Sequence, residues 1–143
     1  MDTTLGSLHN LNHWSILVSA LILWFLGAIW YSPVLFAKPW MAMVHVPTGE
    51  GKKKSMMAGM IASFLCDLVL SYILWHAVNW AHADTWMMGA LVGLLLWIGF
   101  IAAPSLPQGI YEGRPFKLFA INAGYWLVGL VICGGLVAVW RWS

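Results

Sequence analysis

The sequence is poor in charged residues and in cysteine. Only 8% of its 143 residues are Asp, Glu, Lys or Arg, and it has two cysteines. A nucleic-acid-binding protein or a disordered chain needs more charge, and a small disulfide-stabilised domain needs more cysteine. By contrast, 62% of the residues are hydrophobic and the mean hydropathy is +0.81. This composition excludes a water-soluble globular domain and indicates an integral membrane protein.

Four apolar runs are long enough to cross a membrane. A helix rises 1.5 Å per residue, so about 20 residues cross roughly 30 Å of hydrocarbon. No basic residue precedes the first run, which favours a permanent helix over a cleaved signal peptide. The predicted spans take up most of the chain and form one all-α domain, residues 1–143, a four-transmembrane-helix bundle. They cover residues 14–31, 56–78, 86–103 and 118–140.

The basic residues predict the orientation of these spans, because Lys and Arg in short loops stay on the cytoplasmic side. Six of the seven lie in the first and third loops, so both termini are expected outside (N-out, C-out). The lysine triplet at 52–54 is expected to attract anionic lipid headgroups rather than a nucleotide. The six residues are Lys38, Lys52, Lys53, Lys54, Arg114 and Lys117.

The sequence allows two interpretations for each of two loops at the predicted cytoplasmic side. Residues 34–46 mix apolar side chains with Lys38 and His45, which suits either a short helix lying in the membrane interface or an ordinary loop touching headgroups. Residues 104–117 are rich in proline and glycine, and they either cap the cytoplasmic end of the bundle or merely turn the chain.

Three stretches have an unusual composition: WYSPVLFAKPWM at 30–41, WIGFIAAP at 97–104, and YEGRP at 111–115 leading to INAGYWL at 121–127. Together they resemble the bacterial family called domain of unknown function 1761, over nearly the whole chain. One departure is Ala37, where the pattern of that family leads us to expect glycine. The resemblance implies a small four-span protein of the bacterial inner (cytoplasmic) membrane, and it implies no activity.

Asp67 is the single ionisable residue well inside a predicted span. It lies about eleven residues from the inner end of the second span, on the order of 16 Å deep and near the midplane. A charged carboxylate there costs roughly 2.5–3.5 kcal/mol. No Lys, Arg or His is expected at this depth, so the side chain should be neutral, hydrogen-bonded, or in contact with water or a cation.

Helical spacing predicts the neighbours of Asp67, because residues four apart lie almost above one another. Two serines share its face, and a polar strip on the fourth span is expected to look into the bundle as well. We expect hydrogen bonds among Asp67 and the serines, with the tyrosine as a further candidate partner. The candidate midplane site is Asp67, Ser63, Ser71, Asn122 and Tyr125.

Small residues predict close helix packing. Gly89 and Gly93 form a GxxxG face on the third span, and Gly59 and Gly129 are expected at helix contacts of the second and fourth spans. Spacing alone leaves open whether the GxxxG face meets a helix of the same chain or of a second copy. Four short spans rarely enclose a pathway alone, so we expect a homo-oligomer.

Histidines gather at the predicted outer side. His9 and His13 have the i, i+4 spacing of two ligands on one helical face, and His76, His82 and Asp84 are expected on the same side. The alternative is a set of interfacial histidines that reach lipid headgroups. Because no cysteine ligand and no HExxH pattern accompanies them, the sequence predicts no metal or cofactor, and these five residues are the candidates if an outer-face metal were bound.

The sequence favours binding or transport over catalysis, because no His is expected beside a buried Ser or Cys. The leading hypothesis is an oligomeric binder or conduit for a small solute, proton or cation at the polar site around Asp67. The alternative is a non-enzymatic accessory or scaffolding subunit of a larger membrane complex, in which Asp67 only joins helices. The two differ in whether water reaches the Asp67 carboxyl.

Overall fold

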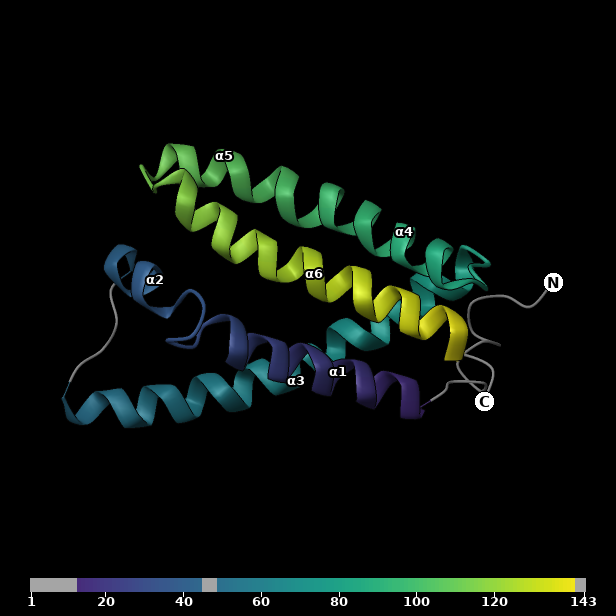
Figure 1. Cartoon of the computed structure of the whole chain (residues 1–143), viewed down its shortest axis with the longest axis horizontal. Helices are drawn as coiled ribbons and strands as arrows, with labels where there is room; N and C mark the ends of the chain where they lie inside the picture. Colours follow the sequence, from purple (N-terminus) through teal and green to yellow (C-terminus); the bar gives the residue numbers. More distant parts are fainter. Residues whose placement is uncertain (1–12, 45–48, 141–143) are drawn as a thin grey trace.

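A computed structural model of the chain describes residues 13–44 and 49–140, and these are helical apart from short turns. The third candidate membrane span is built of α4, the π-helical η2 and α5 in direct succession (Figure 1). The elements are α1 (His13–Trp30), α2 (Ala37–Met43), α3 (Glu50–Trp80), α4 (Trp86–Trp97), η2 (Ile98–Ala102), α5 (Ala103–Tyr111) and α6 (Phe116–Trp140).

Four of these segments are long and apolar enough to span a membrane, which confirms the predicted fold class. The candidate spans are His13–Trp30, Gly51–Trp80, Trp86–Tyr111 and Phe116–Trp140. The short helix α2 lies within residues 34–46, so of the two readings of that segment the structure contains the helix. Four candidate spans are the hallmark of a multi-pass membrane protein.

The third span is longer than predicted, and the expected loop at 104–117 is largely helix. A proline inside a helix removes one backbone N–H and crowds the preceding turn. Here the chain widens into a π-helical turn just before Pro104, where the Ala103 N–H bonds to the Ile98 carbonyl. The helix then continues to Tyr111 and ends at Gly113, whose φ of 71° is the left-handed conformation that glycine adopts without strain.

The helices alternate in direction, so that two ends of the bundle can be distinguished. The start of α3, α2 and the α5–α6 turn lie at one end, and the turn between α3 and α4 and the end of α6 lie at the other (Figure 1). All Lys and Arg residues of the described ranges therefore lie at the α2 end. The first and third loops share an end as predicted; that this end is cytoplasmic stays a prediction.

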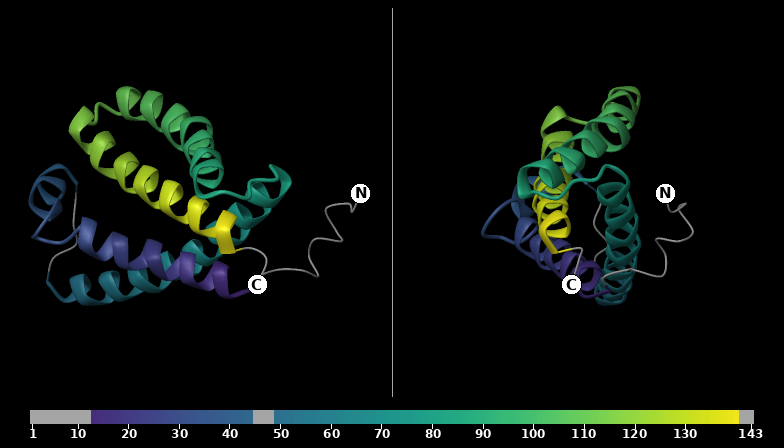
Figure 2. Two further views of the ribbon diagram at one scale, coloured as in Figure 1. Left: turned by 45° about the vertical axis from the view of Figure 1, so that its right-hand side comes forward. Right: turned by 90° about the vertical axis from the view of Figure 1, so that its right-hand side faces the viewer.

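The helix α6 is the centre of the bundle and lies between the α4–α5 segment and the α1–α3 pair (Figure 2). Half of the most apolar 18-residue stretch of α6 is buried, against 17% of the corresponding stretch of α3. Its tightest contact is with α4, where a Cβ built at Gly89 or Gly93 would overlap backbone carbonyls of Gly134 or Leu130. The GxxxG face is therefore occupied by α6 of the same chain, which answers the question of its partner.

The first half of α3 is much less covered than the second. From Gly51 to Ser63 every side chain is exposed, whereas Leu74, Trp75 and Val78 are core residues. The contacts of this first half are with α1: the Trp24 indole Nε1 donates to the Met60 carbonyl at 3.1 Å, and the Trp24 ring packs edge-on against Phe64. One face of α3 thus passes from an open surface into the bundle interior.

Candidate functional site

Asp67 lies where α3 enters the interior, and its side chain is only 2% exposed. Its Oδ2 atom has no hydrogen-bond partner among the described residues. Every described Lys and Arg lies at the α2 end, away from this level. The carboxyl is therefore buried without a cationic side chain to balance a negative charge.

Two serine hydroxyls accompany Asp67 in the interior. Ser71 follows one turn later on the same face of α3, and Ser19 comes from α1; both side chains are fully buried. Neither hydroxyl oxygen has a hydrogen-bond partner in the described part of the chain. Buried polar atoms are nearly always hydrogen-bonded in proteins, so three such oxygens on two packed helices need an additional partner.

The helix α6 closes the other side of this polar group. The Cys133 thiol donates to the Ser19 carbonyl at 3.5 Å. The Tyr125 hydroxyl donates to the Leu23 carbonyl at 2.7 Å. We call Ser19, Asp67, Ser71, Tyr125 and Cys133 the interior polar group.

The structure corrects part of the predicted midplane site. Ser63 is exposed, although it shares the helical face of Asp67, because no helix covers that face of α3 before Asp67. The expected hydrogen bonds of Asp67 are not formed either, since Ser71 has no partner and Tyr125 bonds to Leu23. Spacing along one helix gives a shared face, but only the neighbouring helices decide which part of that face is buried.

Asn122 belongs to a different polar contact, nearer the α2 end. Its Oδ1 atom accepts a hydrogen bond from the Tyr31 hydroxyl at 2.8 Å. The Trp30 indole donates to the Ile121 carbonyl at 2.9 Å, and the Trp97 indole to the Ala123 carbonyl at 2.7 Å. These three aromatic donors bring two of the unusual sequence stretches onto the INAGYWL segment. Helical spacing did not predict these contacts. The unusual composition of the three stretches was the feature of the sequence that pointed to them.

The two other predicted packing glycines differ in their surroundings. Gly129 is a packing glycine, because a Cβ there would lie 2.5 Å from Leu23 Cδ2. Gly59 is exposed with nothing within 4 Å of a built Cβ, so it packs against no helix of its own chain, and a contact with a second copy stays a prediction. The cause is the same as for Ser63, namely the uncovered first half of α3.

The histidines do not assemble a metal site within the described ranges. No three His, Cys, Asp or Glu side chains in residues 13–44 and 49–140 lie together as a metal would require. His13, His82 and Asp84 are exposed, whereas His76 is buried beside the rings of Tyr72, Trp75 and Trp80. His76 is thus not an interfacial side chain as expected, and His9 lies outside the described residues.

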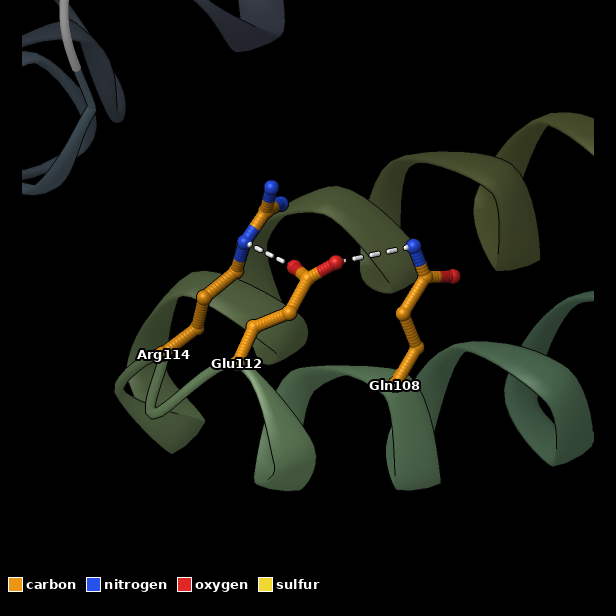
Figure 3. A network of polar contacts seen from close by, with 3 residues as sticks. All are labelled: Gln108, Glu112 and Arg114. Atoms are coloured by element: carbon orange, nitrogen blue, oxygen red, sulfur yellow. Dashed lines mark hydrogen bonds and ion pairs between the residues drawn. The ribbon is translucent and has the colours of Figure 1, made fainter.

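A second polar cluster lies at the α2 end of the bundle, on the turn that follows α5. Glu112 pairs with the Arg114 Nε atom at 2.7 Å and accepts a hydrogen bond from the Gln108 amide at 3.2 Å (Figure 3). The three side chains border a cavity of about 520 Å³ between η2, α5 and α6. Because the ion pair is largely exposed, it contributes little to stability.

Comparison with protein families gives the relationship of the chain. The family described as Protein of unknown function (DUF1761) matches residues 14–138. The chain belongs to the DUF1761 family. The match covers nearly all of the four candidate membrane spans of this DUF1761 chain. No curated protein and no solved structure matches it.

Proposed function

We propose that this membrane protein binds a proton or a small inorganic cation at the interior polar group and conducts it across the bundle. The observation that carries the proposal is the buried Asp67 carboxyl, whose Oδ2 atom has no partner and no counter-charge among residues 13–44 and 49–140. A bound cation or proton removes the cost of a charged carboxylate in the membrane.

The chemistry of the surrounding atoms supports binding of a hard cation, which prefers oxygen ligands. The unpartnered atoms of Ser19, Asp67 and Ser71 are all oxygens. Carboxylate and hydroxyl oxygens suit such cations, whereas soft metals prefer sulfur ligands. A carboxyl group is also the usual carrier of protons in membrane pathways.

Ion flux into liposomes tests the proposal. The purified protein is reconstituted, and proton, Na⁺ and K⁺ entry are followed separately with ion-sensitive dyes under an imposed gradient. Asp67→Asn keeps the size of the side chain and removes its charge, so it should abolish the flux. Asp84→Asn makes the same change at an exposed carboxyl and should leave the flux unchanged.

Binding is measured independently of flux. A cation that binds only the folded state stabilises it by about 2.7 kcal/mol at one hundred times its Kd. The parent protein and Asp84→Asn should therefore become more resistant to unfolding as the cation or proton concentration rises, and Asp67→Asn should not. Equal flux and equal stabilisation in Asp67→Asn would refute the proposal and favour the accessory-subunit hypothesis.

A further inference from the structure

An apolar groove runs along the outside of the bundle, between α1 and the uncovered first half of α3. Its volume is about 910 Å³, and Trp24 of α1 and Met60 and Phe64 of α3 are among its walls. The hydrogen bond from Trp24 Nε1 to the Met60 carbonyl, 3.1 Å long, joins the two helices at its base. The groove thus belongs to a fixed helix pair rather than to a loop.

One end of this groove carries positive charge. Lys52 and Lys53 line it there, and no Asp or Glu is among the described residues that do so. Both lysines are exposed, and neither pairs with a described acidic side chain. The groove therefore has an apolar wall along its length and two exposed ammonium groups at one end.

The position of these lysines in α3 itself calls for an anion. They lie in the first turn of the helix, where the helix dipole is positive and cations are unfavourable. The N-cap residue is Gly49, which offers no side-chain cap, and the Lys52 N–H bonds to the Gly49 carbonyl at 3.2 Å. A phosphate group at this place would be attracted by the positive end of the helix dipole and would balance the charge of the lysines.

The length of the groove matches one leaflet of a membrane. From Lys52 to Leu65 α3 rises about 20 Å, compared with roughly 15 Å for half of the hydrocarbon core. The charged end lies at the start of the Gly51–Trp80 span, where headgroups are found, and the other end lies two residues before Asp67, inside that span. An acyl chain that starts at the lysines would run along Trp24 toward the membrane interior.

A second copy of the chain fits this groove less well than a lipid. Two copies with the same orientation in a membrane, paired through this face, would bring two sets of Lys52, Lys53 and Lys54 together. Like charges at close range in a membrane interface repel strongly. An anionic partner turns the same charges into an attraction.

We propose that the groove is a binding site for one anionic phospholipid, with its phosphate at Lys52 and Lys53 and an acyl chain against Trp24, Met60 and Phe64. Attraction of headgroups to the lysine triplet follows from the sequence alone; the defined single site follows from the groove. The site is independent of the interior polar group.

Titration in detergent with dioleoyl phosphatidylglycerol, followed by native mass spectrometry, tests the proposal. One molecule should bind to the parent protein, and the zwitterionic dioleoyl phosphatidylcholine should bind at least tenfold more weakly. Each lysine near an anionic headgroup is worth about one kcal/mol, so the double substitution of Lys52 and Lys53 by Gln should weaken binding about thirtyfold. Inorganic phosphate should not compete, because it cannot occupy the apolar walls.

Two further variants distinguish a defined site from general attraction. The matched control replaces Lys38 and Lys117 by Gln, with the same change of charge at the same end of the bundle, and should bind like the parent protein. Met57→Trp fills the groove at an exposed position and should weaken binding of the anionic lipid with all lysines present.

Three outcomes would overturn the proposal. These are equal weakening in the two double lysine variants, unchanged binding in Met57→Trp, and a dimer that dissociates when the groove is filled. The Asp67→Asn variant should bind the lipid like the parent protein, so a failure of the ion proposal and a failure of the lipid proposal are told apart.

Discussion

Replacing Gly93 by Ala tests the closest helix contact of the bundle. Gly93 on α4 faces the backbone of Leu130 on α6, and a Cβ at Gly93 would overlap the Leu130 carbonyl group. Backbone atoms in the middle of a helix cannot move alone. The substitution must therefore shift α4 as a whole away from α6.

The magnitude follows from two opposing effects. Overpacking a tight contact costs about 1–3 kcal/mol, while Ala is better than Gly in a helix interior by about 0.5–1 kcal/mol. Gly93→Ala should therefore lower the free energy of unfolding by about 0–2.5 kcal/mol. Gly59→Ala is the matched control, because Gly59 is also in a helical span but has nothing within 4 Å of a built Cβ. It should be neutral or stabilising by up to about 1 kcal/mol.

Unfolding in mixed micelles with increasing SDS, followed by tryptophan fluorescence, measures both variants. The parent protein provides the reference, and its eleven tryptophans supply the signal. Equal stability of Gly93→Ala and Gly59→Ala would refute the packing argument. Loss of an oligomer without any change in monomer unfolding would instead place the GxxxG contact between copies.

Two more substitutions are tested by the same unfolding measurement. Trp97→Phe removes the hydrogen bond to the Ala123 carbonyl and should lower the free energy of unfolding by about 0.5–1.5 kcal/mol. The indole nitrogen of Trp126 bonds to no described residue, so Trp126→Phe should lower it less. The reverse order would contradict the hydrogen bond of Trp97. Gly113→Ala forces a Cβ into the left-handed conformation at φ 71° and should cost about 1–2 kcal/mol, whereas Gly109→Ala, within α5, should not destabilise; equal effects would show that the turn relaxes freely.

The membrane spans were predictable because they depend on local composition. The runs at 14–31, 56–78, 86–103 and 118–140 each overlap one candidate span of the structure, and only the ends differ. The largest difference is at Pro104, which a sequence argument takes as the end of a helix. The π-helical turn that lets the helix continue depends on backbone geometry over several residues, which no single residue signals.

The candidate site was predictable only in part. Asp67 stands out in any hydropathy pattern, and helical spacing correctly joined it to Ser71 on one face. The same spacing also included Ser63 and Gly59, which the structure leaves exposed. It missed Ser19, which is buried because α1 packs against α3 and α6.

The sequence by itself determined that this chain is a bundle of four apolar helices with a buried acid. The reason is that the length, hydropathy and charge of each run are local properties, and these decide whether the run is stable as a helix in a membrane. Tertiary structure decided which surfaces are used. The glycines of α4 pack against the backbone of α6, and other helices cover α3 only in its second half. These facts depend on how helices from distant parts of the chain cross, and the crossing is set by side-chain shapes on both partners at once.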